Sequence, residues 1–271
     1  MYRKIFVHAA APDNSPLLDG RIYLRNPSGT RDRITFFRGS LIDTVESLTG
    51  NERQYGGGTL DTAVTTDATS ITVNVGAAED RVFRDGDLIG LAEGDHAEFA
   101  RLLPSRAVTW NGDRATLRLV DGLGGSFLAG ITTVSSCLEA TIQGGLDSWV
   151  SDSLEGVLHP TAIHAEAVGG IDQEWTITFT SPDDFICSGD TVGQIGVGSI
   201  NSDFSPVNPD FSTPFFTILD SAWDGIWMDG ETVRFHSHPA AVAIWERRFI
   251  PAGIAILTTR SVCMVVTGRS G

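Results

Sequence analysis

Short stretches in which apolar and polar residues alternate, each followed by a glycine-containing turn, recur along this 271-residue chain. The clearest is 70–75, Ser-Ile-Thr-Val-Asn-Val, whose β-branched residues share one face of an extended strand. The segment 174–180 repeats the pattern with Trp175, Ile177 and Phe179 on one face. Thirty glycines and few helix signals favour many short strands. We therefore expect a mainly-β fold, an antiparallel β-sandwich or barrel with long loops and one or two short helices.

The region 70–120 is expected to form a small antiparallel unit. In 82–91 a turn leads into an apolar strand, and 107–119 contains two alternating runs joined by an Asn-Gly pair. Such a pair is the usual signal for a hairpin with a type I′ turn, which needs positive φ at both central residues. Further strands are expected at 230–236 and 261–267.

Helices and loops are expected in four other stretches. Residues 40–48 and 146–154 have the composition of short capped helices. The stretch 50–66, which contains three consecutive glycines at 56–58, predicts a flexible excursion that is mobile unless a neighbour orders it. Residues 181–229 are rich in Asp, Asn, Ser, Pro and Gly, which is typical of long loops.

The length suits one large all-β domain or two ordinary domains. We expect an N-terminal arm with a short helix over 1–60, a first β unit over 61–160, and a second β unit with long acidic loops over 161–271.

The charge is unevenly distributed along the chain. Thirty-four acidic residues oppose nineteen basic ones, of which only Lys4 is a lysine, for a net charge of −15. From 119 to 233 there are seventeen acids and no Lys or Arg. Such a segment cannot hold phosphates by charge, so binding of nucleic acid irrespective of its sequence is disfavoured there. It can instead repel phosphate, bind divalent cations or keep the protein soluble.

Several cellular and chemical classes are disfavoured. No apolar run approaches the 18 residues of a membrane-spanning helix, and residues 1–7 turn polar too early for a signal peptide. Cys137, Cys187 and Cys263 are too far apart for a CxxC metal pair or a disulfide set, and are interpreted as buried apolar residues. A soluble, globular, unsecreted protein without a cofactor is expected.

One histidine pair has the spacing of a metal site. His236 and His238 fall on the same face of a strand, where two imidazoles can ligate zinc together with Asp229 or Glu231. With no cysteine nearby, a polar pair facing a loop is the preferred interpretation, and no metal site is predicted.

Four aspartates form a second candidate group for cations. They lie in loops rich in oxygen ligands but match no EF-hand spacing. They are interpreted as candidates for cation binding or for an acidic channel lining: Asp183, Asp184, Asp203 and Asp210.

No catalytic residue is predicted. The chain lacks GxSxG and a P-loop, and the glycine-rich stretch 193–198 lacks the strand-then-helix context of a phosphate loop. Two carboxylates suffice for a glycosidase, but seventeen acids make some pair inevitable. Trp223 and Trp227 could form an aromatic platform for a sugar, although packing in the core is the preferred interpretation. We expect a protein that is not an enzyme.

Two stretches resemble a known group of proteins. They are 69–73 with 83–89, which has the form ATSITV…FRxGDLI, and 238–253 with the upstream 187–193. Both are similar to virion structural proteins of tailed bacteriophages. The resemblance implies a β-rich subunit that works by assembling. Tail tubes of this group are stacked, usually hexameric rings of β-sandwich or barrel subunits, whose loops and termini lock to the next ring.

Within that group we expect the tail tube protein, located in the virion and assembled in the host cytoplasm. Its partners would be its own copies, as homo-oligomeric rings, together with other tail or neck proteins, and no membrane. The acidic segment 119–233 would line a channel through which DNA passes without specific binding. The residues expected at subunit contacts are Arg234, Arg247, Arg248, Arg260 and Tyr55.

Three kinds of alternative remain open. The first is a neck, head-completion or baseplate component. The second is a carbohydrate- or receptor-binding tail module, which requires exposed Trp223, Trp227 and Trp245. The third is a glycosidase.

Overall fold

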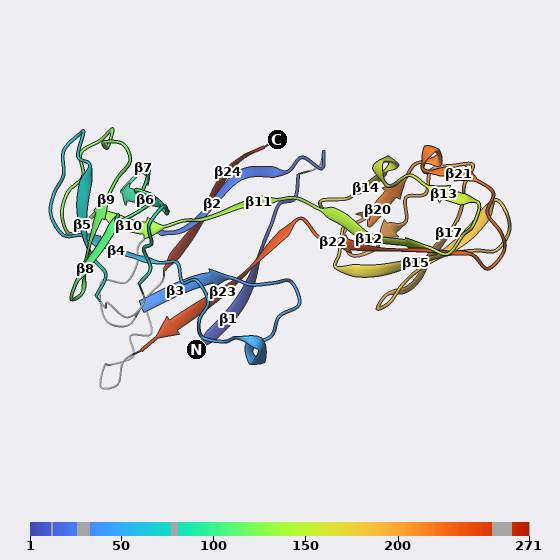
Figure 1. Cartoon of the computed structure of the whole chain (residues 1–271), viewed down its shortest axis with the longest axis horizontal. Helices are drawn as coiled ribbons and strands as arrows, with labels where there is room; N and C mark the ends of the chain where they lie inside the picture. The colour runs from blue at the N-terminus through green and yellow to red at the C-terminus, as the bar shows by residue number, and fades with distance from the viewer. Residues whose placement is uncertain (12, 26–32, 77–80, 251–261, 271) are drawn as a thin grey trace. The chain divides into compact units, whose positions relative to one another are not determined.

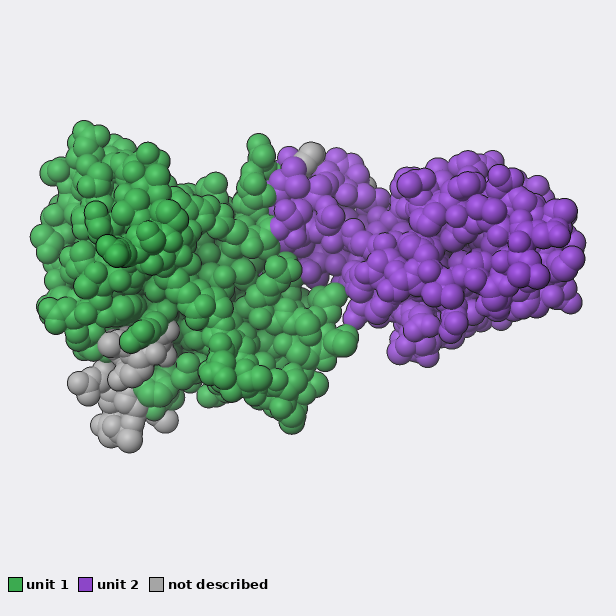
Figure 2. Space-filling model, viewed as in Figure 1, with its two compact units in different colours: residues 1–6, 19–140, 242–269 green, residues 7–18, 141–241, 270–271 purple. Residues whose placement is uncertain are grey.

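The computed structural model describes residues 1–270 except 12, 26–32, 77–80 and 251–261. The chain forms two compact units, which are coloured separately in Figure 2. Unit 1 comprises Met1–Phe6, Asp19–Ala140 and Val242–Arg269. Unit 2 comprises Val7–Leu18, Thr141–Ala241 and Ser270–Gly271. The division expected from the sequence follows the chain in order, whereas each unit combines three separate segments.

The expected fold class is confirmed. Strands make up 54% of the described residues and helix 4%, and the sheets are antiparallel and open rather than closed into a barrel (Figure 1). None of the helices in the described part of the chain is long and apolar enough to span a bilayer.

Unit 1 is built around a seven-stranded sheet in the order β7-β6-β10-β4-β5-β9-β8. Its strands are β4 (Gly57–Leu60), β5 (Ser70–Asn74), β6 (Leu88–Glu93), β7 (His96–Arg101), β8 (Val108–Asn111), β9 (Arg114–Arg118) and β10 (Thr133–Ser136). The alternation seen in the sequence buries Ile71 and Val73 of β5 and Leu117 of β9 in one core. The β unit expected over 70–120 therefore exists, and strands from outside that range complete it.

The β8–β9 hairpin confirms the expected strand pairing but not the turn. Asn111 lies opposite Arg114, so the two loop residues are Gly112 and Asp113. Gly112 has φ +56°, and Asp113 is not among the residues with positive φ. Positive φ at the first loop residue alone is the pattern of a type II′ turn, so the expected type I′ turn is wrong.

The stretch 50–66, expected to be mobile unless a neighbour orders it, is ordered by neighbouring strands. Tyr55 is bridged to Phe36, and Gly57 and Gly58 begin strand β4 inside the sheet. A Cβ atom on Gly58 would lie 2.0 Å from the carbonyl oxygen of Asn74. These glycines therefore permit a close approach of neighbouring strands rather than mobility.

Two three-stranded sheets, β1-β23-β3 and β11-β2-β24, complete this region. Their strands are β1 (Tyr2–His8), β2 (Leu17–Arg25), β3 (Arg33–Arg38), β11 (Leu138–Ile142), β23 (Ala241–Phe249) and β24 (Cys263–Ser270). The helix expected over 40–48 is reduced to the 3-10 turn η1 (Val45–Ser47). Cys263 is exposed on β24, so its expected burial is wrong, whereas Cys137 and Cys187 are buried as expected.

Unit 2 is built around a five-stranded sheet in the order β12-β22-β15-β16-β17. Its strands are β12 (Gly145–Ser151), β15 (Gln173–Phe179), β16 (Asp184–Gly189), β17 (Gly193–Ser199) and β22 (Thr232–His238). The remaining elements are three two-stranded pairs, β13 (Gly156–Leu158) with β21 (Trp223–Gly225), β14 (Ile163–Ala165) with β20 (Phe216–Ile218), and β18 (Val207–Asn208) with β19 (Thr213–Pro214), and the 3-10 turns η3 (Pro160–Ala162) and η4 (Asp220–Ala222). The region 181–229 therefore contains strands where only loops were expected.

The core of unit 2 is aromatic. Trp175, Ile177 and Phe179 of β15 are fully buried, as their alternation predicted. Phe179 stacks on Trp227 with ring centroids 4.4 Å apart, and Trp223 packs edge-on against the same phenylalanine at 5.6 Å. The expectation that the two tryptophans pack in the core is confirmed.

The helix expected over 146–154 is wrong, because this segment forms strand β12. Leu146, Trp149 and Val150 have helical spacing, but a β-bulge between Asp147 and Val150 changes the strand register there. Ser148 adopts φ +58° within the bulge. Trp149 stacks on Phe235 of the neighbouring strand at 4.6 Å.

Candidate functional site

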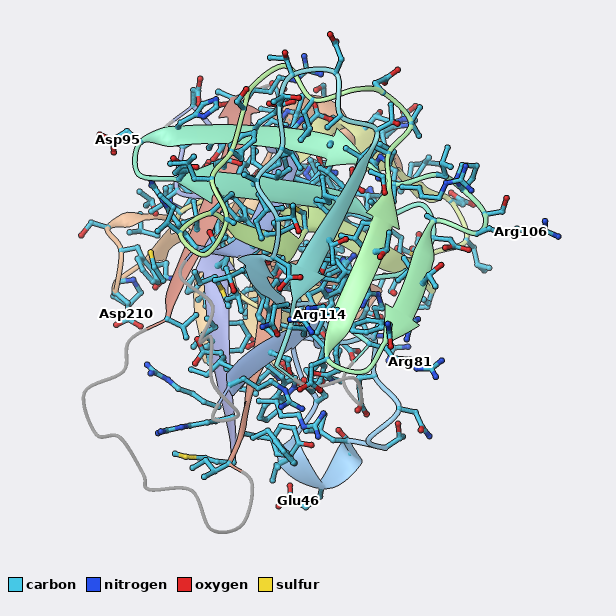
Figure 3. All side chains as sticks on the ribbon, turned by 90° about the vertical axis from the view of Figure 1, so that its left-hand side faces the viewer. Glu46, Arg81, Asp95, Arg106, Arg114 and Asp210 are labelled. Atoms are coloured by element: carbon cyan, nitrogen blue, oxygen red, sulfur yellow. The ribbon has the colours of Figure 1, made fainter. Side chains whose placement is uncertain are left out.

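The net charge belongs entirely to unit 2. Unit 2 contains sixteen Asp and Glu residues and one Arg, Arg234, which gives −15. Unit 1 contains eighteen acidic and eighteen basic residues and is neutral. In Figure 3 side chains of both signs, such as Arg106 and Glu46, are labelled on unit 1. The acidic character is therefore a property of one folded unit.

The acids of unit 2 lie at its surface. Thirteen of the sixteen are exposed, and the other three, Glu166, Asp172 and Glu231, are half-buried. A surface with so little positive charge repels polyanions and raises the local concentration of cations.

The four aspartates predicted as a group are exposed but bind separate neighbours. Asp184 accepts a hydrogen bond from the Ser181 hydroxyl, and Asp203 accepts one from the backbone N–H of Asp220. The backbone of Asp210 donates to Asn208. Neither these three nor Asp183 belongs to a group of three or more possible metal ligands in the described part of the chain.

One cluster of possible metal ligands does form, around the histidine pair. Among the described residues, Asp147, His236 and His238 are the one group of three or more such side chains whose ligand atoms all lie within 4.8 Å of one another. His236 and His238 are on β22, and Asp147 is directly opposite His236 on β12. Residues opposite each other in an antiparallel pair point to the same face, so the strand register creates the cluster.

Asp172 approaches the same cluster from the other side of β22. It precedes Gln173, which lies opposite the buried Ser237, and its side chain therefore points to the solvent face with the histidines. Oδ1 of Asp172 is 3.0 Å from Nε2 of His236 and 3.2 Å from Nδ1 of His238. Nε2 of His238 is 3.0 Å from Oδ2 of Asp147. Carboxylates thus contact both nitrogens of the His238 ring.

The acids that the sequence suggested as a third ligand are engaged elsewhere or stand apart. Glu231 accepts hydrogen bonds from the Ser153 hydroxyl and the Met228 backbone. Asp229 is exposed and does not join the cluster. Asp147 and Asp172 were missed because they are 89 and 64 residues away from His236 in the chain. Only strand register brings these residues together.

The surroundings of Asp147 favour its ionised form. A hydrogen bond from the Ser148 hydroxyl, followed by the contact with His238, holds the pKa of Asp147 below its ordinary value. An ionised carboxylate next to two imidazoles can accept a hydrogen bond from a ring N–H or bind a cation.

The residues predicted for subunit contacts differ in their surroundings. Arg234 is exposed on the solvent face of the five-stranded sheet of unit 2. Arg247 and Arg248 are half-buried on β23, and Arg260 lies outside the described residues. Tyr55 is half-buried, stacks on Phe36 and has Arg53 over its ring, so it does not lie on a free arm.

The remaining features give little support to catalysis or sugar binding. Burial raises the pKa of the Cys137 and Cys187 thiols to about 12, which makes both thiols unreactive. Trp223, Trp227 and Trp245 are all buried, so they cannot form an exposed sugar platform. An open hollow of about 620 Å³ in unit 2 is bordered by β12 and by residues 160–165. Its titratable lining residues are Asp13 and His164.

None of the protein-family models, curated proteins or solved structures compared with the chain matches it.

Proposed function

We propose that this chain is a structural subunit of a tailed-phage virion, in particular the tail tube protein, which assembles with its own copies into stacked rings. The observation that carries the proposal is the confinement of the whole net charge to unit 2, beside a neutral unit 1. The acidic surface of unit 2 is thus suited to face a polyanion, while unit 1 carries no net charge that would oppose contact with other subunits.

The charge argument concerns the DNA path. A ring that directs unit 2 towards its axis collects sixteen acids from every subunit around the channel. DNA phosphates are repelled by such a wall and have almost no basic side chain to bind, so the duplex can pass without being retained. Asp183, Asp184, Asp203 and Asp210 are exposed members of this surface.

The open sheets support assembly by self-association. Strand β17 is an edge strand of the five-stranded sheet and has no charged side chain. Its one irregularity is a bulge at Ile195, beyond which Gly196–Ser199 pairs regularly with β16. Val197 on this edge is 64% exposed. An uncharged strand edge with an exposed β-branched residue can pair with a strand of another chain.

Electron microscopy of the purified full-length chain, with light scattering on the same sample, tests the proposal. Stacked rings or tubes with a central channel are the expected result. Isolated closed rings that do not stack would assign the chain to the neck instead. A monodisperse monomer at all concentrations would contradict a ring-forming subunit.

A further inference from the structure

We propose that Asp147, His236 and His238 bind one divalent transition-metal ion of the zinc class, with Asp172 as a positioning residue. This site is independent of the proposed role in the virion. It rests on the side chains that converge on the solvent face of the five-stranded sheet.

The donor set suits such an ion. Zinc is commonly held by imidazole nitrogens and carboxylate oxygens, and three protein ligands leave one coordination position for water. Donor atoms bonded at about 2.1 Å to one tetrahedral ion lie about 3.4 Å apart. The ligand atoms of the three side chains already lie within 4.8 Å, and His238 and Asp147 are 3.0 Å apart. Small side-chain rotations therefore suffice to enclose an ion.

Asp172 orients the histidine rings. By accepting a hydrogen bond from Nδ1–H of His238 at 3.2 Å, it selects the tautomer in which Nε2 has a free lone pair. That nitrogen faces Asp147. The same oxygen of Asp172 is 3.0 Å from the His236 ring, so one carboxylate restrains both imidazoles. A carboxylate behind a metal-binding histidine is a common arrangement in zinc sites.

The scaffold and the charge around the site favour binding. Strand β22 is paired on both sides, with β12 and with β15, which fixes the backbone that carries the two histidines. The ligands are only partly buried, so an ion can enter from solvent. Glu174 lies opposite His236 on β15 and adds an acid to the same face, where Arg234 is the one base of unit 2. The net charge of −15 on unit 2 attracts cations to this surface.

Calorimetric titration of zinc chloride into the full-length chain tests the proposal. The protein should carry Cys263→Ser, since Cys263 is the exposed thiol and a possible competing ligand. One saturable site is expected. His236→Ala and His238→Ala should each weaken binding by about 100-fold or more, while His164→Ala, an exposed histidine of the same unit, should leave it unchanged.

Asp172→Asn tests the positioning role separately. Loss of a hydrogen-bonded carboxylate behind a ligand typically weakens metal binding by about 10- to 100-fold. The visible absorption of bound Co²⁺ should change in this variant, because the ring orientation changes, whereas a merely structural residue would leave the spectrum intact.

A third measurement needs no substitution in the cluster. Zinc should protect His236 and His238, but not His164, from diethyl pyrocarbonate, as mapped by mass spectrometry. Three results would overturn the proposal: absence of saturable zinc binding, zinc binding that persists without the two histidines, or modification of His236 and His238 that zinc leaves unchanged. The cluster would then be a set of solvated ion pairs.

Discussion

At the scale of single residues, a buried hydroxyl ties together two parts of the unit 2 core. Ser237 Oγ accepts a hydrogen bond from Nε1 of Trp175 at 2.7 Å and donates one to the carbonyl of Ile171 at 2.7 Å. Ser237→Ala leaves both groups without this partner in a buried site. We expect it to lower the free energy of unfolding by about 1–3 kcal/mol. Denaturant titration checks this, with the exposed Ser202→Ala as the control, and equal stabilities of the two variants would contradict it.

Another residue-scale prediction concerns the single lysine. Partial burial opposes ionisation of Asp43, but the Lys4 ammonium at 2.5 Å and the Trp245 indole N–H outweigh it and hold the pKa of Asp43 below 3.8. Because the folded pKa is depressed, this stabilisation is fully present above pH 3.8 and is lost as the pH falls through the folded value.

Asp43→Asn should therefore destabilise the protein at pH 7 by about 1.5 kcal/mol and flatten the loss of stability in acid. Unfolding midpoints measured between neutral pH and strongly acidic pH check this. A variant whose acid profile has the same slope as the parent chain would exclude Asp43 as a contributor.

The histidine cluster shows which residues of the site could be predicted from the sequence and which could not. The two histidines could be recognised as one face of a strand because their spacing is local. Their carboxylate neighbours could not, because Asp147 and Asp172 reach them through pairing with two different strands. Nearby acids such as Asp229 were the natural but incorrect guess, since sequence proximity does not determine which strands are adjacent.

At the scale of elements, the glycines of β4 allow a close approach to the backbone of the neighbouring strands. A Cβ on Gly58 would lie 2.0 Å from the backbone oxygen of Asn74, and backbone cannot move aside as a flexible side chain can. We expect Gly58→Ala to destabilise unit 1 by about 3 kcal/mol or more. Gly124→Ala is the matched control, because its nearest contact would be 3.7 Å away. Thermal unfolding of the two variants decides, and equal midpoints would contradict the close packing.

The strands differ in how well the sequence alone predicts them. Strands with regular alternation, such as β5 and β15, were identified correctly because half-buried strands have a period of two. Strand β12 was mistaken for a helix because its bulge at Ser148 shifts the apolar residues to helical spacing. The glycines of β4 were expected to be mobile unless a neighbour orders them, because the local sequence does not reveal the neighbouring strand.

The edge strand β17 gives a prediction for assembly. A lysine on a strand edge discourages pairing with another chain. Val197→Lys should therefore reduce ring or tube formation in light scattering by about 10-fold or more. Val207→Lys adds the same charge at a similarly exposed valine on β18 and should assemble like the parent chain. If both variants assemble equally well, β17 is not a contact strand.

At the scale of the whole molecule, charge and fold coincide in a way that the linear sequence shows only in part. The stretch 119–233, which has no Lys or Arg, indicated an acidic region. It begins within unit 1, however, and unit 2 also includes residues 7–18. When the charges are counted for each folded unit, the net charge is −15 in unit 2 and zero in unit 1. Each unit is assembled from three chain segments, and no local pattern specifies such an arrangement.

This separation predicts how salt affects assembly. If unit 2 lines a channel, each added subunit brings fifteen net negative charges towards the same axis, and their repulsion opposes ring closure. The screening length falls from about 10 Å at 0.1 M salt to about 3 Å at 1 M. We therefore expect a larger assembled fraction at 1 M than at 0.1 M NaCl, as measured by sedimentation.

Neutralising acidic residues of unit 2 should promote assembly in the same way as added salt, because both reduce the repulsion between subunits. A variant with Asn at 183, 184, 203 and 210 lowers the unit 2 charge from −15 to −11 and should assemble at lower salt than the parent chain. The control replaces four exposed acids of unit 1, Asp67, Asp95, Asp113 and Asp121, with Asn, which changes the total charge equally. If the two variants respond alike, only the total charge matters. If salt dissolves the assemblies, attraction between unlike charges holds the subunits together, and unit 2 does not face its own copies across a channel.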